Sequence, residues 1–244
     1  MMLMPFISRL DKLYWAISSK RLSAALFKHR VLAGAEHRFV LDPAFQTIVD
    51  IGANRGQFAL AARHWAPNAR VISFEPLSAP ARIFRSVFTE DDKIVLHEAA
   101  IGPQPQRCRM HVSARDDSSS LLPICDLQSE IFPGTAEAST TEVHVAPLDA
   151  FVKPDEIRGP AMLKLDVQGY EYEALCGCES LLRRFDFVYC ECSYVELYSG
   201  QKLAADIITW LSDRGFLLKG MFNPAYDAKG QAVQADFLFA RGAS

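Results

Sequence analysis

Residues 50–59 read DIGANRGQFA, and this stretch decides the fold. An apolar run ends in an acid here, and two glycines, Gly52 and Gly56, follow four residues apart. The dinucleotide-binding pattern G-x-G-x-x-G would need further glycines at positions 54 and 57, where this chain has Asn54 and Gln57. The phosphate-binding P-loop also needs glycine where Gln57 stands. Neither nucleotide-phosphate pattern therefore fits this turn.

The remaining pattern is D-x-G-x-N-x-G, which runs from Asp50 to Gly56. This spacing resembles the first motif of class I S-adenosylmethionine (SAM) methyltransferases. A turn that lets the backbone approach a bulky ligand favours glycine, and Asn54 belongs to the residue types that best tolerate a positive φ. We therefore expect Asp50, Gly52, Asn54 and Gly56 to form a cofactor-binding turn, in which Asp50 orders the turn rather than touching the cofactor.

From residue 47 onward, apolar runs of strand length alternate with segments of helical periodicity. Such alternation predicts an α/β fold, a Rossmann-like sheet with crossover helices on both faces. The last two strands follow one another with no helix between them, so we expect an antiparallel final strand in a sheet of seven. The expected strands are 47–51, 70–75, 93–102, 161–166, 187–192, 216–221 and 236–241. The expected helices are 55–65, 78–88, 170–184 and 202–214.

Two segments depart from this alternation. Residues 103–141 break the alternation, and two strand-like stretches, 107–112 and 142–148, enclose a polar loop. This pattern predicts an antiparallel excursion beside the active site, mobile over 113–140. Residues 1–44 show helical spacing of apolar side chains. We interpret 1–44 as an N-terminal helical extension that serves as a lid or as an oligomer contact. A homodimer formed through this helix is one such contact. Residues 45–244 then form one methyltransferase domain.

Composition excludes several classes of protein. The chain of 244 residues is 50% hydrophobic, enough for a sizeable core, and its formal net charge of −3 argues against a nucleic-acid partner. The apolar stretch at the N-terminus is too short and too charged for a secretory signal or a membrane span. Six cysteines include two C-x-C pairs, a spacing unlike that of zinc sites. The sequence predicts a cytoplasmic protein with reduced thiols and no metal site.

Acidic groups end several of the expected strands, where ligands of open α/β sheets bind. Glu75 ends the second strand, and its carboxylate could accept hydrogen bonds from both hydroxyls of a ribose. Pro76 follows it. After the third strand, the small side chains of Ala99 and Ala100 leave room for an adenine ring. We count these four residues with the cofactor-binding turn, and we add Asp166, which ends the fourth strand beside the expected sulfonium.

Taken together, the chain resembles the FkbM family of methyltransferases over about residues 45–240. The resemblance rests on VDIGANRGQFA, FEPL, AAIG, SSSL, LDAF and KLDVQGYEYEAL, in that order. KLDVQGYE is its most specific piece. The resemblance implies a class I fold, SAM as the cofactor, and mostly O-methylation of hydroxyls on sugars and other secondary metabolites. Many members of the family carry Glu where this chain has Gln168, which weakens any case for Gln168 as a base.

Three carboxylates are candidates for catalysis. Asp166 ends its strand beside the expected sulfonium, Glu191 ends the neighbouring strand, and Glu171 opens the next helix. An alcohol needs help to lose its proton, so these groups are expected to supply a general base, or two of them could hold a divalent cation. We favour the metal-free version, because no compact ligand set stands at the strand ends.

Other functions stay open at this point. An NAD(P)-dependent oxidoreductase and a non-enzymatic SAM-binding or assembly protein are the alternatives to a methyltransferase. Nitrogen methylation is a further option, although the N-P-P-Y-type tetrapeptide of many amino-methylating enzymes is absent. The expected partner is a small-molecule or carbohydrate acceptor, whose identity the sequence does not give.

Overall fold

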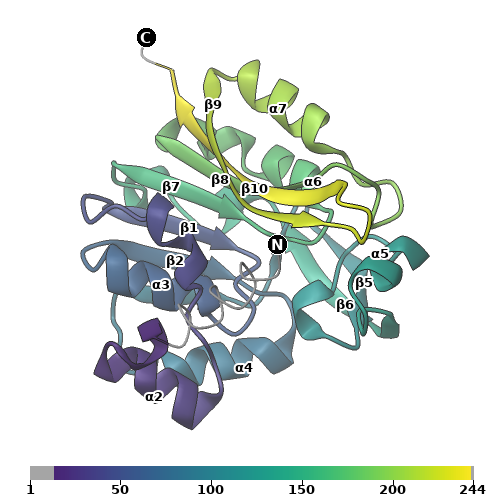
Figure 1. Cartoon of the computed structure of the whole chain (residues 1–244). Helices are drawn as coiled ribbons and strands as arrows, with labels where there is room; N and C mark the ends of the chain where they lie inside the picture. The colour runs from purple at the N-terminus through teal and green to yellow at the C-terminus, as the bar shows by residue number, and fades with distance from the viewer. Residues whose placement is uncertain (1–13, 243–244) are drawn as a thin grey trace.

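The computed structural model describes residues 14–242. Its centre is a seven-stranded sheet in the order β3-β2-β1-β7-β8-β10-β9 (Figure 1). Strands β3, β2, β1, β7 and β8 are parallel, whereas β10 runs antiparallel to both of its neighbours. This confirms the predicted sheet and its antiparallel last strand. The strands are β1 (Thr47–Ile51), β2 (Arg70–Phe74), β3 (Ile94–His97), β7 (Ala161–Leu165), β8 (Phe187–Ser193), β9 (Phe216–Tyr226) and β10 (Ala232–Arg241).

Helices cover both faces of this sheet. Alternate residues of β1 point to opposite faces. Ile48 packs in one core cluster with side chains from α2, α3 and α4, while Val49 and Ile51 pack in a second with those of α6 and α7. All of β1 is buried, as expected for a parallel strand between two layers. The helices are α2 (Lys20–His29), α3 (Gln57–Trp65), α4 (Ser78–Val87), α6 (Glu171–Gly177) and α7 (Ala204–Ser212).

The predicted excursion forms a small sheet of its own, in the order β4-β6-β5. Strands β5 (Gln106–Ser113) and β6 (Glu137–Ala146) pair antiparallel, which confirms the predicted ladder. The segment between them contains a 3-10 turn, η2 (Asp116–Ser118), and the short helix α5 (Asp126–Ile131). It therefore carries regular structure. Its predicted mobility without ligand stays a prediction.

Four predicted elements were wrong in extent. The last two strands, expected at 216–221 and 236–241, are longer, since β9 runs over Phe216–Tyr226 and β10 over Ala232–Arg241. The expected strand 93–102 divides into β3 and a separate β4 (Ala100–Ile101), which pairs with β6 instead of the main sheet. The expected helix 170–184 ends at Gly177 and continues as a 3-10 turn, η5 (Glu179–Arg184). A Cβ on Gly177 would lie only 2.5 Å from the carbonyl oxygen of Gly102. The helix thus ends where two backbones meet too closely for a side chain.

The N-terminal extension packs against the side of the domain that carries α4 (Figure 1). In α2, Leu22 and Ala25 are buried, whereas Phe27 is 75% exposed. Leu10 and Leu13 of the predicted apolar repeat lie outside the described residues. A later part of the extension, the 3-10 helix η1 (Ala35–Val40), reaches the cavity described below. The boundary at residue 44, the lid and the oligomer contact stay predictions.

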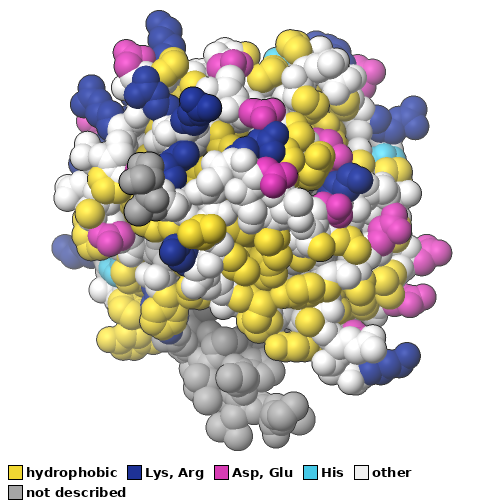
Figure 2. Space-filling view, turned by 90° about the horizontal axis from the view of Figure 1, so that it is seen from above, with side chains coloured by type: hydrophobic (Ala, Val, Ile, Leu, Met, Phe, Trp, Pro, Cys, Tyr) yellow, Lys and Arg dark blue, Asp and Glu magenta, His cyan; other side chains and the backbone are white. Residues whose placement is uncertain are grey.

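The surface carries charges of both signs. On the face shown in Figure 2, Lys and Arg side chains are interspersed with Asp and Glu, and apolar side chains gather in a band along one side. The edge strand β9 also exposes apolar side chains, among them Leu217 and Met221. None of the helices between residues 14 and 242 has the length and apolar character needed to cross a bilayer.

Candidate functional site

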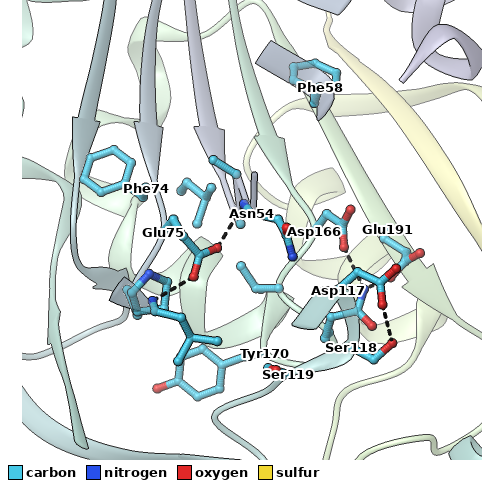
Figure 3. A pocket seen from close by; sticks show the side chains of 18 of the residues that line it. Asn54, Phe58, Phe74, Glu75, Asp117, Ser118, Ser119, Asp166, Tyr170 and Glu191 are labelled. Carbon is cyan, nitrogen blue, oxygen red and sulfur yellow. Dashed lines mark hydrogen bonds between the residues drawn. The ribbon is translucent and has the colours of Figure 1, made fainter. Parts of the chain in front are cut away.

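A cavity of about 380 Å³ opens at the carboxyl ends of β1, β2, β7 and β8. The excursion segment Arg115–Leu121 and η1 contribute to its walls as well. Figure 3 shows the carboxylates of Glu75, Asp117, Asp166 and Glu191 around it. The lining residues used below are Gly52, Asn54, Glu75, Pro76, Leu77, Ala99, Ala100, Met110, Ser118, Ser119, Lys164, Asp166, Gln168, Tyr170, Glu191 and Gln234.

The glycine turn forms one wall of the cavity. Gly52, Asn54 and Gly56 adopt φ angles of 82°, 47° and 96°, so all three lie on the left-handed side that ordinary residues avoid. A Cβ on Gly52 would meet the carbonyl oxygen of Asp166 at 1.8 Å. The turn therefore requires glycine at position 52, both for its conformation and for the contact with the end of β7. Gly56 shapes the turn without lining the cavity.

Glu75 ties this turn to the end of β2. Its Oε2 accepts a hydrogen bond from the backbone N–H of Asn54 at 2.9 Å, and its Oε1 accepts one from Leu77 at 2.7 Å. The side chain is buried, yet the residue lines the cavity (Figure 3). A carboxylate can accept several hydrogen bonds at once, so a ligand hydroxyl in the cavity can bond to Glu75 as well. Pro76, Ala99 and Ala100 line the same end of the cavity.

A buried ion pair lies behind the turn. Lys164 Nζ lies 3.1 Å from Asp50 Oδ1 and 3.7 Å from Asp166 Oδ2, and it donates to the carbonyl oxygen of Gly52 at 3.1 Å. Burial alone would lower the pKa of Lys164, but Asp50 and Asp166 outweigh it and raise that pKa. Lys164 therefore stays charged. Asp50 is fully buried and does not line the cavity, and its role in ordering the turn stays a prediction.

Asp166 and Glu191 accept hydrogen bonds from the same nitrogen atom. Gln168 Nε2 donates to Asp166 Oδ1 at 2.8 Å and to Glu191 Oε2 at 3.0 Å. Gln234, from β10, donates to Glu191 Oε1 at 2.7 Å. Burial, followed by the nearby charges of Asp166 and Asp236, raises the pKa of Glu191 well above its usual value. The Asp166 side chain is 35% exposed and faces the cavity, so it is the more accessible of the two carboxylates.

Glu171, the third predicted catalytic carboxylate, does not line the cavity. It is buried, and its Oε1 accepts hydrogen bonds from the backbone N–H groups of Val167 and Gly169 at 2.9 and 3.2 Å. Burial raises the pKa of Glu171 to about 7 despite these bonds. Through these contacts the Glu171 carboxylate stabilises the turn between β7 and α6. The structure thus gives Glu171 a structural position beside the site rather than one within it.

Sequence reasoning missed residues in and behind the wall of the cavity. Tyr198 and Gln234 contribute to the hydrogen bonds of the site, but both lie far from the motifs in sequence, and no local pattern marks them. Ser118 and Ser119 stood in the recognised stretch SSSL, and both line the cavity. Tyr170 closes the apolar end, and burial raises the pKa of Tyr170 to about 12, so its hydroxyl stays protonated.

No cluster of three or more His, Cys, Asp or Glu side chains suited to a metal ion occurs within residues 14–242. Cys178, Cys190 and Cys192 are buried in the apolar core, each as a free thiol. Burial raises the pKa of Cys178, which keeps that thiol protonated. These three cysteines therefore act as small core side chains.

Comparison with known proteins gives a consistent result. The family description "Methyltransferase FkbM domain" matches residues 50–218. The 2-O-methyltransferase NoeI of Sinorhizobium fredii (strain NBRC 101917 / NGR234) is 28% identical over 173 residues, which cover 66% of this chain and 69% of that protein. A solved "putative O-methyltransferase" from Klebsiella pneumoniae has a TM-score of 0.50 and 13% identity, over 96% of this chain and 97% of that one. The similarity to the Klebsiella pneumoniae protein shows a shared fold.

The cavity suits the cofactor of such an enzyme. Glu75 offers a buried carboxylate to the hydroxyls of a ribose, and Leu77, Met110 and the two alanines offer apolar surface to a planar ring. Gly52 leaves its stretch of backbone free of a side chain, so a ligand can approach the turn closely.

The family match covers more than half of the chain and includes the glycine turn, Glu75 and both carboxylates of the site. The fold, the position of the cavity and the chemistry of its walls agree with it. The chain belongs to the FkbM-domain family of methyltransferases, and its cofactor is S-adenosylmethionine.

Proposed function

We propose that this methyltransferase acts on the oxygen of a hydroxyl group carried by a sugar or another small metabolite. The observation that carries the proposal is Asp166. Its carboxylate reaches the cavity while Lys164 and Gln168 hold it from behind. The printed name of NoeI, a 2-O-methyltransferase, supports oxygen as the acceptor atom. The family match removes the NAD(P)-dependent oxidoreductase from the alternatives.

The reaction needs an electrophilic methyl source and a proton acceptor. When bound, SAM would supply a methyl group on a positively charged sulfur, and loss of that methyl would leave S-adenosylhomocysteine. Asp166 accepts the proton that the hydroxyl loses as its oxygen forms the new bond to the methyl carbon in place of the carbon–sulfur bond, and the proton then passes to solvent. Ser118, Ser119 and Gln234 line the cavity with hydroxyl and amide groups, which can hold the other hydroxyls of a polyol.

The function is tested by methyl transfer from labelled SAM to panels of sugars, polyols and amines. Label that appears as a methyl ether supports the proposal. Label found only on amines would replace oxygen by nitrogen as the acceptor. Stoichiometric SAM binding without transfer to any panel member would favour the non-enzymatic alternative. Asp166→Asn serves as the negative control in each assay, because it preserves the size of the side chain.

Glu75→Ala is expected to weaken SAM binding by about 10- to 150-fold. The change removes an acceptor of charge-assisted hydrogen bonds, each of which contributes about 1.5–3 kcal/mol. Calorimetric titration with S-adenosylhomocysteine measures the effect without an acceptor. The matched control is Glu98→Ala, because Glu98 is an exposed carboxylate that bonds Ser78 and Arg85 and does not line the cavity. Affinity like that of the wild type in Glu75→Ala would refute the ribose assignment.

A further inference from the structure

A continuous set of hydrogen bonds connects the cavity loop to the two carboxylates. The hydroxyl of Tyr198 donates to Gln168 Oε1 at 2.8 Å, and its oxygen lies 3.2 Å from the carbonyl oxygen of Ser118. Gln168 Nε2 in turn bonds both Asp166 and Glu191. Figure 3 shows Asp166, Glu191 and Ser118 grouped on one side of the cavity. Tyr198 does not line the cavity, so it acts on the site only through its neighbours.

The orientation of the Gln168 amide decides what the carboxylates face. An amide has a donating nitrogen at one end and an accepting oxygen at the other, and the two ends are nearly equal in shape. With Nε2 toward Asp166 and Glu191, both carboxylates receive a hydrogen bond. A flipped amide would turn its oxygen toward them, and an ionised carboxylate cannot donate to that oxygen. The flipped form would favour a proton on one of the two acids.

Tyr198 favours the unflipped amide together with the two carboxylates, because its hydroxyl donates to Gln168 Oε1 at 2.8 Å while Asp166 and Glu191 accept from Nε2. It is only 2% exposed, and its backbone N–H donates to Gln201 Oε1 at 2.8 Å. Its side chain also packs so closely on Gly169 that a Cβ there would lie 2.8 Å from the ring. Burial, followed by the charges of Glu191, Glu171 and Asp166, raises the pKa of Tyr198, which keeps the hydroxyl protonated as a donor. A rigid donor therefore faces the oxygen end of the amide.

We propose that Tyr198 is a positioning residue that holds the Gln168 amide with its nitrogen toward Asp166 and Glu191, so that Asp166 keeps the position from which it acts in methyl transfer. The catalytic part of this inference rests on the proposed function, because it assigns the proton of the acceptor hydroxyl to Asp166. Nothing in the sequence motifs marks Tyr198, which reaches Gln168 from the segment after β8.

Other charged groups near Asp166 and Glu191 also influence the titration of these carboxylates. Lys164 lies 3.7 Å from Asp166, and the charges of Asp236 and Glu171 raise the pKa of Glu191. Asp117 lines the cavity from the loop. None of these groups changes in a Tyr198→Phe variant, so any altered titration reports the lost hydroxyl.

Tyr198→Phe is expected to raise the apparent pKa of the carboxyl pair by about one to two units, the equivalent of one hydrogen bond to a charged group. The measurement is a carbon-13 NMR titration of protein labelled at the Asp and Glu carboxyl carbons. Signals are assigned from their loss in Asp166→Asn and Glu191→Gln. On a confirmed acceptor, the acid limb of kcat should move to higher pH by the same amount, while affinity for S-adenosylhomocysteine stays within about twofold.

Two further variants sharpen the test. Tyr194→Phe is the matched control, because the Tyr194 hydroxyl contacts only the sulfur of Met221, and it should leave the titration and kcat unchanged. Gln168→Leu removes the amide and should reproduce the shift of Tyr198→Phe, and the double variant should add little to it. A titration in Tyr198→Phe equal to that of the wild type overturns the inference, whatever the acceptor is. A shifted titration with transfer to nitrogen would keep the positioning role and reject only the proposed function.

Discussion

Asp166→Asn is expected to lower kcat by about 10²- to 10⁴-fold, the usual contribution of a general base. The amide keeps the size and place of the carboxylate but cannot accept the proton of the acceptor hydroxyl. Because the lost interaction acts mainly in the transition state, affinity for S-adenosylhomocysteine should change little. Steady-state kinetics with labelled SAM and a confirmed acceptor measure the first quantity, and calorimetry measures the second. Asp213→Asn, an exposed position outside the cavity, is the control.

The same experiment separates two mechanisms. If Asp166 acts without metal, added chelator leaves kcat unchanged, and Glu191→Gln is less damaging than Asp166→Asn because Glu191 is held by two amide donors. If both carboxylates hold a hard cation, chelator abolishes activity and the two variants are equally damaging. Wild-type turnover by Asp166→Asn would contradict both mechanisms and leave only substrate positioning as the source of catalysis.

Gly52→Ala is expected to destabilise the fold by more than about 4 kcal/mol, a large share of the stability of a typical domain. The new methyl group would sit 1.8 Å from the carbonyl oxygen of Asp166, and neither backbone can move without disturbing the centre of the sheet. Denaturant unfolding measures the loss, or soluble yield if the variant does not fold. Gly230→Ala is a close control, since its φ of 81° nearly equals that of Gly52 but no atom lies within 4 Å of the added carbon.

The control separates backbone strain from collision. Gly230→Ala should cost only the left-handed penalty of about 1–2 kcal/mol. The difference between the two variants is then the cost of the contact between the turn and β7. Similar losses in both variants would show that strain alone makes Gly52 necessary.

Much of the fold follows from local patterns. Buried strands such as β1 and β7 are short apolar runs between turn signals, and the segments between them have helical periodicity, so their order and type could be predicted. The prediction failed where tertiary contacts decided the outcome. β4 leaves the main sheet because it pairs with β6, and α6 ends where Gly177 meets Gly102. Neither contact has a signature within its own segment.

The sequence could predict those site residues that stand at the ends of strands. Glu75, Asp166 and Glu191 follow strands of one parallel sheet, so their convergence at one edge could be expected. The direction in which each side chain points could not be predicted from the sequence. Glu171 turns toward the backbone of its own loop, and only the three-dimensional structure shows this. Tyr198 and Gln234 come from segments whose place is set by chain topology, which a motif does not record.

The position of β10 has a consequence for how the protein is synthesised. β9 precedes β10 in the chain but lies outside it in the sheet, so β8 and β9 are neighbours only through a strand that is translated after both. Domains fold as units during synthesis, and a nascent chain that stops before Ala232 has no partner for the open edge of β8. It also lacks Gln234, the donor to Glu191 Oε1. A ribosome that terminates early on this message therefore releases a polypeptide with an unfinished sheet and an unfinished acidic pair, a natural substrate for cellular proteases.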